Sequence, residues 1–567
     1  MLISLLIPMT IEAQQVIPVP VQQQLTSGKP FVLSSKTRVA YVDSQLASVA
    51  TQLVGDLKQQ TGLNLKQGSF KTSRGDIALL IAPDDESLPA RKEVLGVSAK
   101  SKDGVDERYT LDISENGVWV KGASKEAVIL ACATLRQLLQ VDSKVTIQAQ
   151  TVKDAPLFAW RGLSLDVSRY FLEKDEVKKV IDMMALYKLN VLHLHLTDNQ
   201  GWRFQVLGYP ELTQVGGFVE NNGRKGGFYT QEDYLELVNY AESRAITVVP
   251  ELDLPGHTQA VFKAYPTYQN CASLPGEMNL AGQSTSAIDP DDDNAMKMVE
   301  TAVNQLAALT PGRFIHIGGD ETLGMSEEKY TRFIKLLQNY IKEKVHKEMV
   351  GWQEMARAQA GEGIIIQNWL AFSKKQMARA RQAMGNAGTA KPSSETKTET
   401  ASAAASAASA AVNAFIENYR KGQTDVPKAL EQGAKILLSL QAYNYLDCPY
   451  EEESADAAQQ AESSRLGMRS YTPQNLQDMY DWDPTTTLQT GTKDVAGVEA
   501  AIWCESVTSL SDLQFLVLPR LTGVAEHAWS QPAQAKWDTY KTRLSTQGSI
   551  WQAMGWNYFK SSLVEWK

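Results

Sequence analysis

The stretch from residue 314 to residue 321 reads Phe-Ile-His-Ile-Gly-Gly-Asp-Glu, and its pattern recurs along the chain. Its apolar first half is typical of a short buried strand. Two glycines then break the strand, and the adjacent carboxylates of Asp320 and Glu321 follow. Carboxylates at the end of a buried strand are costly unless they have a partner or a function. Taken alone, the stretch also fits a strand-ending turn with solvated acids.

Seven other segments share the pattern of a short apolar run that ends in polar or aromatic residues. They span residues 162–167, 190–196, 246–250, 348–351, 363–366, 435–439 and 497–502. Stretches with helical periodicity, such as 174–187 and 231–244, lie between most of them. Strands that alternate with helices in this way predict an α/β fold, the (β/α)8 TIM barrel. The active site of such a barrel lies at the C-terminal ends of its strands, where these polar residues fall.

Composition and charge exclude several classes of protein. The chain has 567 residues, of which 43% are hydrophobic, and this is ordinary for a globular protein. A net charge of −9 without a basic patch argues against a nucleic-acid partner. The four cysteines fit neither a zinc site nor a disulfide framework. The chain has no run of 18 apolar residues, so we expect no integral membrane segment.

The domain organisation follows from shifts in composition. Residues 1–15 resemble a clipped signal peptide that lacks its basic start, which predicts a secreted or periplasmic protein. Residues 16–153 mix strand-like and helical runs and predict a small α+β domain. The barrel is expected over 154–567, with residues 513–527 as its closing helix. A low-complexity Ala/Ser insertion at about 375–412 predicts a disordered loop between the sixth and seventh strands.

Tryptophan is the second chemical signal. Trp352, Trp369 and Trp503 each follow a different predicted barrel strand, and Trp482 lies in a Tyr-Asp-Trp-Asp segment. Tryptophans are more often part of a core, because they bury a large apolar area. Three of them at strand ends, with carboxylates between them, instead favour a sugar site in which pyranose faces stack on rings and hydroxyls bind acids.

His193 and His195 are two residues apart, so on a strand both side chains point the same way. Such a pair is able to bind a metal ion. Packing in the barrel interior is the interpretation we favour, because a metal site needs further well-placed ligands. Asp198 and His257 are candidates for a carboxylate–imidazole pair behind the site.

The adjacency of Asp320 and Glu321 constrains the mechanism. A retaining glycosidase with two flanking carboxylates needs them about 5 Å apart on opposite sides of the bond. Neighbours in sequence are poorly placed for that. They are better suited to different parts of one substrate, with one acid protonating the leaving oxygen and the other holding a second group.

These motifs together resemble glycoside hydrolase family 20, the β-N-acetylhexosaminidases, over nearly the whole chain. The N-terminal part is similar to the small domain that precedes the barrel in that family. The segments that carry the resemblance are Trp160–Gly162, Leu165–Arg169, His193–Trp202, Pro250–His257, His316–Glu321, Gly351–Trp352, Tyr445–Asp447, Asp481–Pro484 and Glu499–Glu505.

The resemblance implies an exo-acting, retaining enzyme that removes terminal non-reducing N-acetylglucosamine or N-acetylgalactosamine from an oligosaccharide or glycoconjugate. Glu321 would be the general acid/base, supported by Asp198 and His257. Asp320 would hold the nitrogen of the substrate's 2-acetamido group. The acetamido oxygen, bound by Tyr445, would attack the anomeric carbon and give an oxazolinium intermediate.

The resemblance also implies a set of sugar-binding residues, and it implies no cofactor and no metal ion. Trp352, Trp369 and Trp503 would enclose the acetamido group. Arg161 and Glu505 would bind the 3- and 4-hydroxyls, Asp447 the outer hydroxyls, and Trp482 the leaving-group sugar.

Two alternatives stay open at this point. One is a non-catalytic sugar-binding protein on a barrel scaffold. Absence of the general acid or of the residues that support it would favour this alternative. The other is a metal-dependent barrel hydrolase that uses His193, His195 and Asp320.

Overall fold

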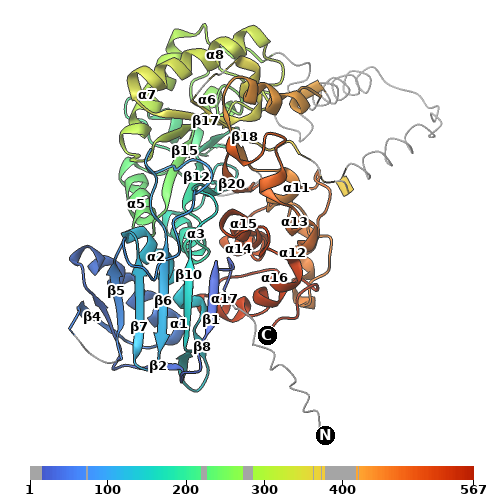
Figure 1. The fold of residues 1–567 in the computed structure, drawn as a ribbon. Coiled ribbons are helices and arrows are strands. Elements are labelled where there is room, and N and C mark those ends of the chain that lie inside the picture. Colours follow the sequence, from blue (N-terminus) through green and yellow to red (C-terminus); the bar gives the residue numbers. More distant parts are fainter. Residues whose placement is uncertain are drawn as a thin grey trace, which may run out of the picture.

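The computed structural model describes residues 16–567 except 72–74, 219–225, 273–284, 360, 362, 372, 374, 377–416 and 419. Residues 1–15 and most of the Ala/Ser insertion therefore lie outside the described residues. Figure 1 shows the N-terminal domain in blue, the barrel strands in green to orange, and a group of C-terminal helices in red.

A closed barrel of eight parallel strands forms the larger part of the chain, which confirms the predicted fold. Each strand coincides with one of the predicted apolar runs. In barrel order they are β11(Arg161–Asp166), β12(Val191–His195), β15(Thr247–Glu251), β16(Phe314–His316), β17(Glu348–Trp352), β18(Ile365–Asn368), β19(Lys435–Leu438) and β20(Val495–Ile502). Because the strands are parallel, their carboxyl ends all open on one face.

Helices cover the outside of the barrel. Between the strands they include α3(Lys174–Leu186), α5(Gln231–Glu242), α6(Gln259–Ala264), α7(Asp293–Ala308), α8(Glu327–Tyr340), η4(Gln353–Ala358), α11(Gln441–Asn444), α12(Gln460–Arg465) and α13(Leu476–Tyr480). After the last strand come α14(Leu510–Val517), α15(Arg520–Trp529), α16(Trp537–Leu544) and α17(Gln547–Met554). Within the described residues, every helix is too short or too polar to span a membrane.

The single closing helix predicted over 513–527 is wrong. The structure has two helices there, α14 and α15, separated by Leu518 and Pro519. Leu518 takes an extended conformation, and the proline ring disfavours the helical conformation in the residue before it. The apolar periodicity continues through the break, which is why the sequence pattern did not reveal it.

The N-terminal domain is an α+β unit, as predicted. Its seven-stranded sheet has the order β1(Gln22–Leu25), β10(Gln150–Asp154), β6(Tyr109–Ser114), β7(Gly117–Gly122), β5(Ile77–Ile81), β3(Arg38–Tyr41), β4(Lys66–Ser69). The helices α1(Ala47–Thr61) and α2(Lys125–Gln137) contact this sheet and each other. They also contact α17 and α3 of the barrel, so the two domains share an interface.

Helix α8 shows how the sequence fixes an element next to the site. Ser326 caps its first turn by accepting a hydrogen bond from the Lys329 backbone. Its buried residues Tyr330, Phe333, Ile334 and Leu337 follow the helical spacing that places them on one face. The hydroxyl of Tyr330 donates a hydrogen bond to the carbonyl of Gly319 at 2.7 Å, and thereby ties the helix to the loop after β16.

Candidate active site

The carboxylate pair predicted from the sequence lies on the loop that leaves β16 at the carboxyl face of the barrel. Gly318 and Gly319 turn the chain there with φ angles of 69° and 99°. A Cβ on Gly318 would stand 1.8 Å from Oδ1 of Asp253, so the position has no room for a side chain. Glu321 also has a positive φ of 41°, a conformation that non-glycine residues rarely adopt. Such local strain is characteristic of functional loops.

Asp320 is the more enclosed of the two acids. Its side chain is 15% exposed against 29% for Glu321, and its buried Oδ1 has no hydrogen-bond partner among the described residues. Burial raises the pKa of Asp320 to about 6; His257 opposes this shift, and the carboxylates of Glu321 and Glu251 add to it. A buried oxygen without a partner is unusual in a folded protein and indicates a place for a bound donor.

A chain of charged groups lies behind Glu321. Nε2 of His257 is 3.6 Å from Oε2 of Glu321 and 3.9 Å from Oδ2 of Asp320. On its other side, Nδ1 of His257 is 3.3 Å from Oδ1 of Asp198. Burial alone would lower the pKa of His257, but Asp198 and the other carboxylates nearby raise it well above its usual value. The structure therefore brings Asp198 and His257 together behind the acid pair, as the sequence suggested.

Arg169 holds Asp198 from the opposite side. Its guanidinium is 2.7 Å from Oδ2 of Asp198, and it lies over the ring of Trp503 at 5.1 Å from the ring centre. His195 approaches the same carboxylate oxygen at 3.1 Å. Arg169 thus links the charged chain to the aromatic part of the site.

The barrel interior beneath the site is polar, and Glu251 is its centre. One oxygen of this fully buried carboxylate accepts from the indole of Trp352 at 2.9 Å and lies 3.1 Å from Nδ1 of His316. The other oxygen contacts His193 at 3.0 Å and also His195. Trp352 is therefore fixed by the network that fills the barrel.

His193 and His195 are packed inside the barrel, the interpretation favoured from the sequence. Burial lowers the pKa of His193, but the carboxylates of Glu251 and Glu499 outweigh this and bring it to about 9. Among the described residues, the groups of potential ligand atoms within 4.8 Å of one another do not combine both histidines with Asp320. The trio suggested for a metal-dependent hydrolase is therefore not assembled.

Aromatic side chains line the site beside the acids. We call this set the aromatic cluster: Trp352, Trp369, Tyr445, Tyr471 and Trp503. Its rings lie close together, with centroid distances of 5.7 Å between Trp352 and Trp503 and 6.0 Å between Tyr445 and Trp503. Three of them lie at the ends of β17, β18 and β20, and Tyr445 and Tyr471 lie in the loop between β19 and β20, so the cluster exists only when the barrel is closed.

Two further carboxylates lie near the cluster. Asp447 is 1% exposed, and within the part of the chain that the structure describes neither of its side-chain oxygens has a hydrogen-bond partner. Burial raises its pKa well above the usual value, and the neighbouring Glu505 adds to the shift. Oε2 of Glu505 is also buried, with no hydrogen-bond partner in the described residues. Arg169 lies close enough to favour the charged form of Glu505, although burial raises its pKa overall. These atoms are suited to accept hydrogen bonds from hydroxyl groups.

Arg161, predicted to bind sugar hydroxyls, is at the wrong end of the barrel. It begins β11, whereas the site lies where the strands end. Its side chain is fully buried and forms two 2.8 Å contacts with the carboxylate of Glu107. The prediction is therefore wrong, and Arg169, beyond the carboxyl end of the same strand, is the arginine of the site.

Trp482 lies outside the aromatic cluster. Its ring stacks on Tyr443 at 5.4 Å and packs against His527 of α15 at 5.5 Å, so both contacts are internal. It packs against the main core and is not a member of the aromatic cluster. Its contact with the leaving-group sugar stays a prediction. Tyr471, 6.0 Å from Tyr445, is a further aromatic residue of the site.

Sequence reasoning assigned no role to several residues that the structure places at the site. They are Arg169, Glu251, Asp253, Glu354 and Tyr471. Asp253 is buried beside the acid pair, and burial together with Asp320 raises its pKa well above the usual value. The sequence contained an indication for Arg169 and Asp253, because each lies within three residues of the carboxyl end of a barrel strand. Nothing in the local sequence marked Glu354 or Tyr471.

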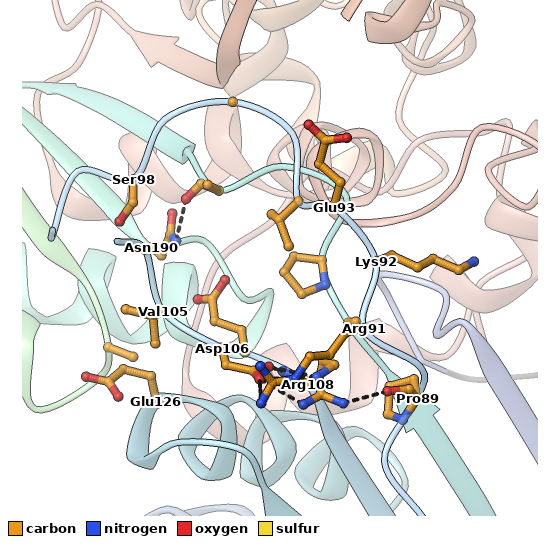
Figure 2. Close-up of a pocket in the computed structure, with 18 of the residues that line it drawn as sticks. Pro89, Arg91, Lys92, Glu93, Ser98, Val105, Asp106, Arg108, Glu126 and Asn190 are labelled. Carbon is orange, nitrogen blue, oxygen red and sulfur yellow. Dashed lines mark hydrogen bonds and ion pairs between the residues drawn. The ribbon is translucent and has the colours of Figure 1, made fainter. Parts of the chain in front are cut away.

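A separate cavity of about 640 Å³ lies at the amino ends of the strands (Figure 2). It is lined by the segment 88–108 and by Ala159, Asn190 and Thr247 at the starts of β11, β12 and β15. Several of its charged groups are already paired: Arg108 with Asp106, Lys100 with Glu126, and Glu107 with Arg161. Because it lies at the amino ends of the strands, this cavity is distinct from the site at the carboxyl face.

A (β/α)8 barrel with an acid pair, an aromatic cluster and unpaired carboxylates at its carboxyl face has the architecture of a barrel glycoside hydrolase. Comparison with known proteins agrees. Residues 158–390 and 395–532 match the model of the glycosyl hydrolase family 20 catalytic domain, and residues 13–155 match domain 2 of that family. The chain belongs to glycosyl hydrolase family 20, and it is a glycoside hydrolase of the β-N-acetylhexosaminidase type.

Similar proteins align over almost the full length. A β-N-acetylhexosaminidase of Cellulomonas fimi is 31% identical over 566 residues, which cover 97% of each chain. The β-N-acetylhexosaminidase structure from Streptomyces coelicolor A3(2) is 32% identical, with a TM-score of 0.76 over 98% of this chain and 99% of that one. A mutant β-hexosaminidase of Streptomyces plicatus in complex with its product, GlcNAc, is 30% identical, with a TM-score of 0.76 over 98% of both chains.

Proposed function

We propose that the protein is an exo-acting, retaining enzyme that removes terminal non-reducing N-acetylglucosamine or N-acetylgalactosamine by substrate-assisted catalysis. The observation that carries the proposal is the placement of two adjacent acids, one with an unpaired buried oxygen, beside a closed aromatic cluster. The acids are neighbours on one loop, which suits one acid for the leaving group and one for the acetamido group. Two carboxylates acting from opposite sides of the bond would not need to be adjacent.

In this mechanism Glu321 protonates the glycosidic oxygen as the acetamido oxygen attacks the anomeric carbon. The bond to the leaving group breaks, and an oxazolinium forms. Asp320 accepts a hydrogen bond from the acetamido nitrogen and offsets the positive charge that develops on the ring. The hydroxyl of Tyr445 donates a hydrogen bond to the acetamido oxygen and keeps its proton. Glu321 then removes a proton from the water that opens the oxazolinium, which restores the original anomeric configuration.

The rest of the site positions the sugar. Trp352, Trp369 and Trp503 enclose the acetamido methyl. Arg169 takes the place first given to Arg161 and, together with Glu505, binds the 3- and 4-hydroxyls, while Asp447 binds the outer hydroxyls. His257 and Asp198 orient Glu321. A panel of aryl β-glycosides that differ only in the sugar tests this assignment, with the highest kcat/KM expected for the two 2-acetamido sugars.

The raised pKa of Asp320 leads to a prediction about pH. Its pKa of about 6 means that the carboxylate loses its charge as the pH falls through that value. Because the mechanism needs that charge, kcat/KM on an aryl N-acetylglucosaminide should decline about tenfold per pH unit below about 6. Asp320→Asn should be far less active and lack this acid limb. An acid limb near pH 4 in the native enzyme would contradict the role given to Asp320.

We predict that the enzyme needs no metal ion. Among the described residues, the group of potential metal ligands that contains both acids is His257, Asp320 and Glu321, whose ligand atoms lie within 4.8 Å of one another. In the proposed mechanism Glu321 transfers protons and Asp320 binds the acetamido nitrogen. A metal ion bound to the same oxygen atoms would block both roles. Activity should therefore persist after dialysis against EDTA, and added Zn²⁺ should inhibit. Loss of activity that Zn²⁺ restores would favour the metal-dependent hydrolase.

The prediction of a secreted or periplasmic location rests on residues 1–15, which lie outside the described residues, and it stays a prediction.

A further inference from the structure

Glu354 is a buried acid next to the proposed acetamido pocket that the mechanism above does not use. It lies in η4, two residues after Trp352, and is 3% exposed. One carboxyl oxygen accepts a hydrogen bond from the indole nitrogen of Trp369 at 3.1 Å. The other accepts one from the side-chain amide of Asn418 at 3.4 Å. Glu354 therefore joins a wall of the pocket to a distant part of the chain.

The backbone that carries Trp369 is tied to the same short helix. The side-chain oxygen of Gln353 accepts from the backbone nitrogens of Trp369 and Leu370 at 3.2 and 2.9 Å. The side-chain nitrogen of Gln353 donates to the carbonyl of Gly422 at 3.0 Å. Both the backbone and the ring of Trp369 are thus held by η4.

Helix 420–431 holds η4 from behind. Its Asp425 is fully buried and accepts from the guanidinium of Arg357 at 2.6 to 3.1 Å. Arg357 also donates to the side-chain oxygen of Asn418, whose amide contacts Glu354. A buried pair of this kind is strongly directional, and removing one partner leaves an uncompensated charge.

We propose that Glu354 is a positioning residue: it fixes the ring of Trp369 as one wall of the acetamido pocket and thereby sets which acyl groups the enzyme accepts. Asn418 contacts Glu354 directly, and the Arg357–Asp425 pair ties η4 to helix 420–431. The inference rests on the proposed function, because the wall that Glu354 holds belongs to the pocket proposed there.

The charge state of Glu354 follows from the groups that face it. Asp320 lies beyond the end of β16, Arg357 on η4, Asp425 on helix 420–431 and Tyr330 on α8. Burial, with a further contribution from Asp320, raises the pKa of Glu354 to about 8; Arg357 opposes the shift and Asp425 adds to it. Glu354 is accordingly neutral at pH 7. It gains a charge above about pH 8, which adds a further negative charge near Asp320.

The first test measures acyl selectivity. One extra methylene in a tight apolar pocket typically costs roughly 10–200-fold in kcat/KM, so the native enzyme should prefer an aryl N-acetyl over an N-propionyl glucosaminide by about that much. Glu354→Leu removes both acceptors at similar volume and should lower this preference about tenfold. Glu348→Gln, at the opposite end of β17 where Glu348 pairs with Arg313, is the matched control and should leave the preference unchanged.

The second test measures how kcat/KM falls at alkaline pH, and it uses a substitution that keeps the hydrogen bond to Trp369. Glu354→Gln can still accept from Trp369 but cannot ionise. Native kcat/KM should fall as the pH rises through about 8, whereas Glu354→Gln should match the native enzyme at pH 7 and hold its activity to higher pH. If Glu354→Leu melts at a much lower temperature than the native enzyme, the proposal is tested by the pH profile of Glu354→Gln alone.

An unchanged acyl preference in a folded Glu354→Leu enzyme would overturn the proposal. So would an alkaline limb that is identical in the native enzyme and Glu354→Gln. These failures differ from a failure of the proposed function, in which the native enzyme itself would show no preference for 2-acetamido sugars.

Discussion

Glu321→Gln should lose about 10²–10⁴-fold in kcat on substrates with poor leaving groups, which is the usual contribution of a general acid. Glutamine keeps the shape of the side chain but has no proton to give to the glycosidic oxygen. Binding of the sugar should change little, because the aromatic cluster and the carboxylates that hold the hydroxyls are intact. The measurement is kcat and KM on a disaccharide such as chitobiose.

Two controls make this result specific. An aryl glycoside with an activated leaving group needs less protonation, so its first step should suffer much less than that of the disaccharide. Glu327→Gln alters a carboxylate on α8 whose side chain is 84% exposed, and it should behave like the native enzyme. Cleavage of the disaccharide by Glu321→Gln at near the native rate would show that another group is the acid.

Replacing the 2-acetamido group of the substrate by a hydroxyl should slow hydrolysis at least about a thousandfold. In the proposed mechanism that group supplies the nucleophile, already oriented beside the anomeric carbon. The loss of an oriented reacting group is expected to have an effect of this size. The measurement compares kcat/KM for aryl β-N-acetylglucosaminide and aryl β-glucoside with the same leaving group.

The identical leaving group makes the comparison sensitive to the sugar alone. A difference that resides in KM only would mean that the acetamido group serves for binding. Comparable kcat values for the two sugars would contradict a substrate-assisted first step.

The barrel was predictable because its signal is repeated. Each strand is a short apolar run with a polar or aromatic residue after it, and the eight strands of the structure coincide with the predicted runs. The acid pair was predictable for the same reason, since Asp320 and Glu321 follow β16 and come directly after a turn that only glycines fit.

Arg161 shows where a motif misleads. It and Arg169 flank the same strand, and both belong to segments that resemble the family. The direction of the strand separates them, because only residues beyond its carboxyl end reach the site. Arg161, at the other end, pairs with Glu107 across the interface with the N-terminal domain.

Other positions depended on partners far away in the sequence. Trp482 packs against Tyr443 and against His527 on α15. Glu354 is connected to Asn418 and, through Arg357, to Asp425, across the Ala/Ser insertion. Neither set of contacts has a local signature, so a single sequence without its fold could not reveal them.

The identity of the nucleophile can be measured with aryl glucosaminides whose N-acetyl group carries none, one, two or three fluorine atoms. Fluorine is close to hydrogen in size but withdraws electrons, and so it weakens the acetamido oxygen as a nucleophile. If that oxygen attacks the anomeric carbon, log kcat/KM should fall steeply and regularly with each added fluorine. A rate that hardly changes across the series would show that a group of the enzyme, and not the substrate, forms the first bond.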